Sequence, residues 1–396
     1  MLTLLALAAL PHFDLAVYEK PRLVQAAEIS VQAEPKTIAA VRNPRSAGGR
    51  HDFSSEGDYW WPDPKNPDGP YLQRDGLSNP DNFVAHRQLL LDFGRHFGVL
   101  AATYKITREE RYAAAAVRHL HAWFVEPATR MNPNLLYSQA IKGINTGRSI
   151  GVIDTLHLAE VALGVEALRG SKALTKAEDA AVSGWFREYL HWLRTHPYGI
   201  DESNAKNNHG TCAWLQIACF AHLLGDEATL AECRARLKEV LLPNQMAPEG
   251  SFPDELRRTK PYGYSIFNLD VMTALAVVLS TPAEDLMTFT LPDGRSLAKG
   301  VAWLAPFIAN KNAWLETVHR TLPGSGPAKP TVTNELVQPD VMYWDNWPVR
   351  QPSLLFGALA TGREDWLALW ETLDPDPQVE EIRRNFPIRQ PVLWVR

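Results

Sequence analysis

Two asparagines and a histidine stand in the densest polar cluster of the chain, the segment Glu202-Ser-Asn-Ala-Lys-Asn-Asn-His-Gly210. An apolar segment with helical spacing follows it, so we expect Asn207, Asn208 and His209 at a helix N-terminus. Free backbone N–H groups and the helix dipole favour an anion at such a position. Asn207 or Asn208 could serve as an N-cap alone. Because two amides, an imidazole and a glycine exceed what a cap requires, we interpret the cluster as functional.

Cations and phenols gather in a second segment, residues 249–265. They are Arg257, Arg258, Lys260, Tyr262 and Tyr264. Proline and glycine keep most of this segment out of a helix, and we expect the next helix to begin near Tyr264. Cations close to a phenol favour the phenolate and lower its pKa, which makes a tyrosine usable as a base near neutral pH. The alternative is an exposed basic loop with the tyrosines packed beneath it.

Aromatic residues mark two long loops that have no helical period. Residues 51–82 contain many turn formers together with Tyr59, Trp60 and Trp61, and residues 322–350 end in an aromatic group that includes Trp344. Loops of this length are usually functional or disordered, and the aromatic content argues against disorder. Both loops could line one mouth of a ring of helices, or their rings could simply pin them to the body.

Together these groups supply what β-elimination on a uronic acid requires. The C5 proton is acidic only when the neighbouring carboxylate is neutralised, and Asn208, His209 and Arg258 could stabilise the charge that develops. A tyrosine could take the C5 proton and protonate the leaving O4. Arg148, at the end of Asn145-Thr-Gly-Arg148, could form a bidentate pair with a carboxylate. The scheme requires no metal, and we expect no cofactor.

Helical hairpins must position these loops and helix ends. From about residue 83 onward apolar residues recur at three- and four-residue steps, and capping boxes at Thr107 and Thr175 predict helix starts. Gly225 is expected to end one helix, and Asp226 to cap the next. The hairpin period of roughly 50 residues indicates a solenoid or a closed ring. No alternating β pattern competes with it, so we predict an all-α fold in one mostly helical domain.

Composition limits the class of protein. The 396 residues include 40 Lys and Arg against 45 Asp and Glu, a net charge of −5, and 45% are apolar. These values exclude a largely disordered chain and a basic nucleic-acid binder. Three cysteines without motif spacing predict neither a disulfide framework nor a zinc site. We expect one catalytic domain over residues 1–396, in which residues 1–10 are either a signal-peptide remnant or the first buried helix. No other stretch is long and uncharged enough to span a membrane.

A set of short motifs spans residues 45–268. They are Arg45-Ser-Ala-Gly-Gly, Ser55-Glu-Gly-Asp-Tyr-Trp-Trp-Pro, Gly69-Pro-Tyr, Arg74-Asp-Gly, Asn79-Pro-Asp-Asn-Phe, Gly143-Ile-Asn-Thr-Gly-Arg, Asn207-Asn-His-Gly-Thr, Gly250-Ser-Phe-Pro, Glu255-Leu-Arg-Arg-Thr and Tyr264-Ser-Ile-Phe-Asn. In these motifs the chain resembles the alginate-lyase-domain polysaccharide lyases. It is most similar to polysaccharide lyase family 38 and more distantly similar to family 5. The resemblance implies an (α/α) toroid or barrel of about six to seven helical hairpins, with aromatic-rich loops over the cleft. It also implies that the protein cleaves β-1,4-linked uronans such as alginate or glucuronan by elimination.

The resemblance also implies roles for single residues. Asn208 and His209 match the pair that handles the carboxylate, Arg258 matches the arginine, and Tyr264 matches the tyrosine acid and base. Arg257 competes with Arg258, because the spacing from arginine to tyrosine differs between the two families. The residues expected to bind substrate are Arg148, Asn145, Arg257, Lys260, Tyr262, Tyr59, Trp60, Trp61, Tyr137 and Trp344.

Ring stereochemistry selects between two routes. In β-D-mannuronate and β-D-glucuronate, H5 and O4 lie on the same side of the ring, so Tyr264 can serve as base and acid in a syn elimination. In guluronate they lie opposite, and His209 would have to be the base with Tyr264 as the acid. We predict the syn route on glucuronan or mannuronate-rich alginate.

Two other functions remain open from the sequence. A glycoside hydrolase on the same toroid would use paired carboxylates, and the candidates are Glu202, Glu249, Asp254 and Glu255. A non-catalytic polyuronate-binding protein would keep the aromatic cleft without needing Tyr264. The expected partner is an acidic polysaccharide, with no nucleic acid and no membrane. We expect a monomer, and a periplasmic or secreted location that follows mainly from the substrate class.

Overall fold

The computed structural model describes residues 10–319, 349–377 and 379–395. Two of the sequence expectations concern residues outside these ranges. The assignment of residues 1–10 rests on residues 1–9, and the aromatic group with Trp344 lies within residues 320–348, so both lie outside the described residues.

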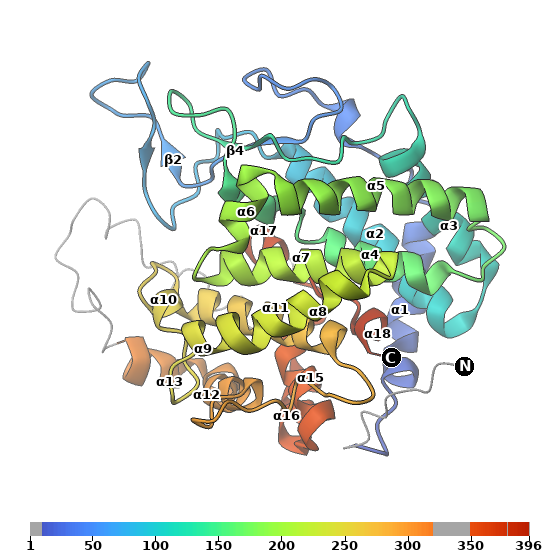
Figure 1. The fold of residues 1–396 in the computed structure, drawn as a ribbon, viewed down its shortest axis with the longest axis vertical. Coiled ribbons are helices and arrows are strands. Elements are labelled where there is room, and N and C mark those ends of the chain that lie inside the picture. The colour runs from blue at the N-terminus through green and yellow to red at the C-terminus, as the bar shows by residue number, and fades with distance from the viewer. Residues whose placement is uncertain (1–9, 320–348, 378, 396) are drawn as a thin grey trace.

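Two layers of helices form the body of the molecule (Figure 1). In the inner layer each helix packs against the next in the order α2, α4, α7, α11 and α15. Their bounds are Ala85–Thr107, Leu158–Leu168, Asn208–Leu224, Pro261–Leu279 and Pro352–Thr361. Longer helices that flank this layer are α1 (Leu15–Val31), α3 (Glu110–Leu120), α5 (Lys176–Thr195), α8 (Glu227–Arg236), α12 (Leu297–Ala309) and α16 (Glu364–Thr372). The fold is an all-α (α/α) toroid, which is one of the two architectures that the hairpin period indicated and the one that the resemblance implied.

Short elements complete the helical body. They are α6 (Pro197–Ser203), α9 (Leu242–Gln245), α10 (Pro253–Leu256), α13 (Lys311–Ala313), α17 (Glu380–Arg384) and α18 (Pro391–Trp394). Tighter or wider turns occur at Ile38–Ala40, His121–Val125, Ser149–Thr155, Leu237–Leu241 and Trp314–His319. Helix α18, close to the C-terminus, packs among α1, α2, α4 and α11.

Helix α11 shows why the inner layer forms the core. It is apolar around its whole circumference, and 17 of its 19 residues are buried. By length and composition this helix contradicts the expectation that no stretch beyond residues 1–10 could span a membrane. Among the described helices it alone is long and apolar enough to do so, but 89% of its apolar window is buried inside the protein. A helix that is hydrophobic on all faces and covered by neighbouring helices is a core helix.

Several predicted helix ends are confirmed. The Thr175 side chain accepts a hydrogen bond from the backbone N–H of Glu178 at the start of α5. Helix α7 ends at Gly225, whose φ of 66° is the left-handed conformation that a glycine adopts without steric cost. Asp226 then accepts the N–H of Thr229 and caps α8.

The predicted helix start at Thr107 is wrong. Helix α2 continues through Thr107 and ends in a left-handed C-cap at Arg108, with φ of 61°. The Thr107 hydroxyl donates to the carbonyl of Thr103 at 2.8 Å, which keeps the residue within the preceding helix. Helix α3 begins at Glu110, without a side-chain cap. A threonine three residues before a glutamate can close one helix as well as open the next.

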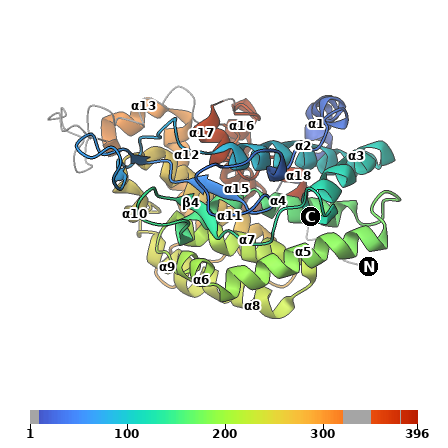
Figure 2. The same cartoon turned by 90° about the horizontal axis from the view of Figure 1, so that it is seen from above.

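Two pairs of short strands lie in the loops at one end of the helices. Strand β1 (Ser54–Glu56) runs parallel to β4 (Tyr137–Ala140), with Ser54 opposite Tyr137 and Glu56 opposite Ala140. Strand β2 (Trp60–Trp61) is antiparallel to β3 (Leu72–Gln73). Figures 1 and 2 show these loops gathered on one side of the molecule, near the starts of α7 and α11.

Candidate active site

The two asparagines at the N-terminus of α7 have different roles. Asn207 is the N-cap, and its side chain accepts the backbone N–H of His209. Asn208 is buried, and its backbone N and Nδ2 donate to the two oxygens of Glu255, each at 2.7 Å. His209 Nδ1 lies 2.5 Å from Glu202 Oε1. Capping therefore accounts for Asn207 alone, and two buried carboxylates hold the residues that follow it.

Arg258 and Tyr264 meet across the start of α11. Nη2 of Arg258 donates to the Tyr264 hydroxyl at 3.1 Å, and the guanidinium carbon lies 4.1 Å from the centre of the phenol ring. The hydroxyl of Tyr59 is 2.9 Å from the same phenol oxygen. Arg258 also pairs with Asp75 through Nη2 at 2.9 Å and Nε at 3.3 Å. The Tyr264 oxygen therefore has two polar neighbours and sits against a cation.

The pKa of Tyr264 corrects the sequence expectation. Burial raises the pKa of this phenol above its ordinary value, and the positive charges of Arg258 and Lys260 offset only part of the increase. The sequence predicted a lowered pKa because it shows the neighbouring cations but not the depth of the side chain. When Tyr264 loses its proton, Arg258 Nη2 and the Tyr59 hydroxyl can both donate to the phenolate.

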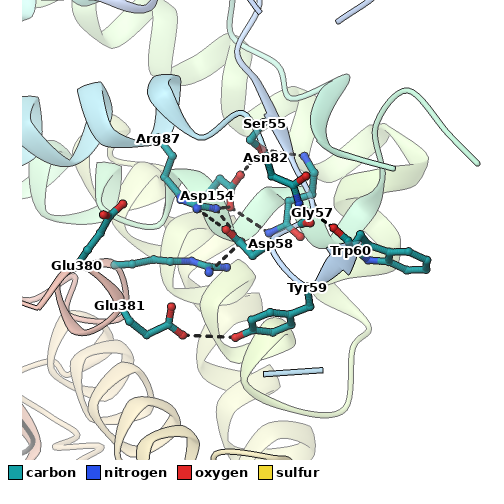
Figure 3. A network of polar contacts seen from close by, with 12 residues as sticks. Ser55, Gly57, Asp58, Tyr59, Trp60, Asn82, Arg87, Asp154, Glu380 and Glu381 are labelled. Atoms are coloured by element: carbon teal, nitrogen blue, oxygen red, sulfur yellow. Dashed lines mark hydrogen bonds and ion pairs between the residues drawn. The ribbon is translucent and has the colours of Figure 1, made fainter. Parts of the chain in front are cut away.

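A buried network of ion pairs supports the segment that carries Tyr59 (Figure 3). Asp58 lies 2.5 Å from Arg87 and 2.8 Å from Arg384. Burial alone would raise the pKa of Asp58, but the two arginines lower it to about 2. Arg87 also reaches Asp154 at 3.5 Å. The network joins the segment after β1 to α2 and α17, elements that are far apart in the sequence.

Helix α17 contributes a second buried ion pair. Glu381 lies 2.8 Å from Lys260, and the Tyr59 hydroxyl lies 3.4 Å from the same carboxylate (Figure 3). Burial would raise the pKa of Glu381, but Lys260 and Arg384 lower it below the ordinary value. Lys260, which the sequence predicts as a substrate-binding residue, is thus paired with Glu381 beside Tyr59.

Gln139 in β4 forms another side of the pocket. Its φ of 49° is uncommon for a residue with a side chain, and its partners hold it there. Arg148 donates through Nε to the Gln139 carbonyl at 3.0 Å and through Nη2 to its Oε1 at 2.9 Å. The Arg148 guanidinium also lies 5.7 Å from the ring centre of Trp60. Burial lowers the pKa of Arg148.

One pocket brings seven of the predicted site residues together. Those seven are Asn208, His209, Arg258, Tyr264, Tyr59, Trp60 and Arg148. The lining also includes Asp58, Gln73, Asp75, Gln139, Ile150, Ile153, Phe267, Arg384 and Asn385. Among the described residues, no group of three or more His, Cys, Asp or Glu side chains is arranged to hold a metal ion.

Tyr262 and Arg257 lie away from this pocket. Tyr262 is buried, donates to the Phe307 carbonyl at 3.3 Å and packs against Trp314. Because α11 begins at Pro261, earlier than predicted, Tyr262 and Tyr264 are two helical positions and roughly 200° apart. Arg257 is exposed and pairs with Asp254 at 2.7 Å. Of the two neighbouring arginines, the structure therefore places Arg258 against Tyr264.

Besides Lys260, three more predicted substrate-binding residues are absent from the pocket lining. Asn145 turns back on its own loop, where Oδ1 accepts the N–H of Ile141 at 3.1 Å. Trp61 donates from Nε1 to the Leu77 carbonyl at 2.9 Å. Tyr137 opens β4 opposite Ser54 in β1. Contacts with backbone atoms hold all three residues, and the residue types alone did not predict these contacts.

Sequence reasoning missed several residues of the lining. Asp75 had a signal, since it stands within the Arg74-Asp-Gly motif. Gln139, Arg384 and Asn385 had none, because no motif includes them and tertiary folding alone brings them to the pocket. Glu202 and Glu255 were considered only as hydrolase carboxylates, whereas the structure bonds them to His209 and Asn208.

The fold and the match to the alginate lyase family together place the protein among the polysaccharide lyases. The alginate lyase family matches residues 37–314, and the chain belongs to this family. An alginate lyase from Bacteroides ovatus is similar to it over 94% of this chain and 93% of that chain, with 28% identity and a TM-score of 0.75. A variant of alginate lyase A1-III in complex with a tetrasaccharide is 15% identical, with a TM-score of 0.55 over 86% of this chain and 84% of that chain. That second likeness shows the fold alone. No match was found among curated proteins.

Proposed function

We propose that the protein cleaves β-1,4-linked polyuronate, either glucuronan or mannuronate-rich alginate, by syn β-elimination. In this specificity it would correspond to polysaccharide lyase family 38. The observation that carries the proposal is the single pocket in which the Tyr264 oxygen meets Arg258 at 3.1 Å and which Asn208 and His209 also line. This combination suits a substrate that brings a carboxylate beside the proton to be removed.

In the proposed mechanism the protein first neutralises the substrate carboxylate. Asn208, His209 and Arg258 donate to it and stabilise the negative charge that spreads from C5 into the carboxyl group. The buried carboxylates of Glu255 and Glu202 hold Asn208 and His209, so little reorganisation is needed when the substrate binds.

Tyr264 then transfers the proton. As a phenolate, stabilised by Arg258 and Tyr59, it takes H5; the C5–H electron pair forms the C4=C5 double bond and the C4–O4 bond breaks. The phenol proton passes to the departing O4, which leaves a 4,5-unsaturated uronate end and restores the phenolate. One oxygen can perform both transfers only where H5 and O4 are on the same face, which favours mannuronate or glucuronate at the cleavage site.

The raised pKa of Tyr264 gives this mechanism a pH dependence. Since the base form is the phenolate and burial disfavours it, kcat should rise with pH through the alkaline range until the protein unfolds. The hydrolase alternative requires two free carboxylates, whereas Glu202 and Glu255 are both bonded to the residues assigned to the substrate carboxylate.

The test is ultraviolet absorbance of the purified protein with glucuronan, polymannuronate and polyguluronate in separate cuvettes, each with a chelator. Rising absorbance from the C4–C5 double bond on glucuronan or polymannuronate is the expected result. New reducing ends without that absorbance would indicate hydrolysis, and binding without either signal would indicate a non-catalytic protein. A signal on polyguluronate alone would contradict the syn route.

Three further properties belong to the same proposal. We infer that the chain is a monomer with one catalytic domain, and that it acts in the periplasm or outside the cell, where a polymeric substrate is met. Light scattering of the purified protein tests the first, and fractionation of the source cells tests the last.

A further inference from the structure

Asp75 places a carboxylate of the protein on the arginine that is assigned to the substrate carboxylate. Its Oδ1 lies 2.9 Å from Arg258 Nη2 and its Oδ2 lies 3.3 Å from Nε. Oδ2 also accepts from the Thr259 hydroxyl at 3.0 Å. Two parallel hydrogen bonds to one edge of a guanidinium are the geometry in which arginine recognises any carboxylate. Asp75 therefore makes the contact that a uronate would make.

The backbone directs Asp75 into the pocket. Strand β3 ends at Gln73, and a turn closed by the hydrogen bond from Leu77 N to the Arg74 carbonyl at 3.1 Å carries the next residues. Gly76 has a φ of 80°, which this turn requires and which a residue with a side chain would resist. The hairpin is fixed to Tyr59 by the bond from Arg74 N to the Tyr59 carbonyl at 2.7 Å.

Arg258 cannot offer the same edge to two carboxylates. Nη2 has two hydrogens, of which one serves Asp75 and the other serves Tyr264. A uronate that approaches along the Nε–Nη2 edge must displace Asp75. Arg258 and Asp75 are about a quarter exposed, at 24% and 29%, so the pair lies at the pocket surface where a ligand can compete for it.

We propose that Asp75 acts as an internal stand-in for the uronate carboxylate and competes with the substrate for Arg258. An anionic ring replaces one carboxylate on Arg258 by another. A neutral ring brings no carboxylate to Arg258 and leaves the Asp75–Arg258 pair in place. The inference rests on the proposed function, in which Arg258 binds the carboxylate of the substrate.

The experiment compares Asp75→Asn with the unmodified enzyme in titration calorimetry. The probes are methyl β-D-glucuronide, which carries no O4-linked sugar to eliminate, and its neutral counterpart methyl β-D-glucoside. Removing a partly exposed ion pair should tighten glucuronide binding about three- to fivefold, with glucoside binding unchanged. KM for the cleaved polymer should fall by a similar factor.

Two matched variants separate occupancy of Arg258 from a general change in charge. Asp68→Asn removes one negative charge from an exposed position in the same loop, outside the pocket lining, and should leave glucuronide affinity unchanged. Thr259→Val removes one hydrogen bond to Asp75 without changing charge, and should tighten binding about twofold.

Other outcomes overturn the inference. Unchanged, weaker or unmeasurable glucuronide binding by Asp75→Asn would show that Asp75 does not compete for Arg258. A fall in kcat with unchanged KM would make it a residue that orients Arg258 toward Tyr264 instead. Because the glucuronide titration involves no turnover, it remains distinct from the absorbance assay, whose failure would reject the proposed function itself.

Discussion

The two sides of the pocket are built by different forces. One side, the helical floor, consists of the starts of α7 and α11 with Asn208, His209 and Tyr264. The other, the loop wall, consists of residues 51–82 together with α17. Apolar burial fixes the floor, since 17 of the 19 residues of α11 are buried. The wall has strands of only two or three residues and is held by ion pairs.

This difference separates chemistry from recognition. A side chain at the start of a packed helix keeps its position when a neighbouring loop changes, so the floor suits atoms that transfer protons. Charged groups that hold a loop can be exchanged for the charges of a ligand, so the wall suits selection of the substrate. Changes at the proton-transferring atoms of the floor should therefore have the largest effect on kcat, and changes to the wall should affect mainly stability and KM.

The largest effect is expected at the floor tyrosine. Tyr264→Phe removes the oxygen that transfers the proton, so kcat should fall by at least about 10³-fold while the melting temperature changes little. Tyr59→Phe, on the wall, removes one hydrogen bond to that oxygen and should lower kcat only about tenfold. Initial rates of absorbance on the preferred polymer, with thermal unfolding as the control, measure both. Retained turnover in Tyr264→Phe would end its assignment as the base.

The second effect concerns the ion pairs of the wall. Asp58→Asn leaves Arg87 and Arg384 without the carboxylate between them, and should cost about 3–5 kcal/mol in the free energy of unfolding. The matched control is Asp365→Asn, which breaks an exposed pair with Arg363 and should cost less than about 1 kcal/mol. Urea denaturation of the three proteins gives the comparison. Equal losses in both variants would mean that the buried network contributes no more than a surface pair.

The third prediction is that floor and wall respond to pH with opposite sign. Asp58 has its pKa lowered to about 2, so the stability it contributes is present above its unfolded value of 3.8 and is lost as the pH falls toward 2. Asp270, within α11, accepts the backbone N–H of Ser353, and burial raises its pKa to about 7. Its contribution is present below pH 3.8 and is lost as the pH rises through 7.

Asp270→Asn should therefore remove the loss of stability on the alkaline side. Between pH 5 and the pKa of about 7 the linkage amounts to about 1.4 kcal/mol per pH unit, so the two proteins should differ by at most about 3 kcal/mol over the range from pH 5 to pH 8. Denaturant midpoints measured across this range give the slope for each protein. The same alkaline slope in Asp270→Asn would show that another group is responsible.

The smallest effect is expected where neutral hydrogen bonds hold the wall. Asn82 Nδ2 donates to the carbonyls of Gly57 at 2.6 Å and Trp60 at 3.1 Å. Asn82→Ala should cost about 1–2 kcal/mol and raise KM severalfold, because Tyr59 and Trp60 lose their support. Asn268→Ala, a buried asparagine of α11, is the matched variant of the floor, with a similar stability loss and an unchanged KM. A raised KM in both would remove the distinction between wall and floor.

The sequence predicted most of the fold because its signals are local. Helical periodicity, the cap at Thr175 and the C-terminal glycine Gly225 depend on residues within one or two turns, and the structure places them as expected. The capping-box pattern at Thr107 failed because the same residues also satisfy the end of α2. A capping-box pattern between two helices therefore does not show by itself whether it ends the first helix or begins the second.

The helix start at Pro261 shows how one error in a predicted helix boundary affects the predicted site. The helix was expected to begin near Tyr264, so both tyrosines were assigned to the site. A proline at the first helical position is a start signal that could have been read from the sequence. With it, Tyr262 and Tyr264 fall on opposite faces of α11 by geometry alone. Which face meets the pocket was decided by the packing of Tyr262 against Trp314.

The sequence by itself determined the residue types of the chemistry: an amide and an imidazole at a helix N-terminus, and an arginine close to a tyrosine. Tertiary structure alone decided that Arg258 rather than Arg257 meets Tyr264, that Tyr59 and Asp75 share these groups, and that burial raises the pKa of the phenol. The physical reason is the distance along the chain between the groups that interact. Helix caps depend on nearby residues, whereas desolvation and ion pairing depend on which distant segments fold over a charge.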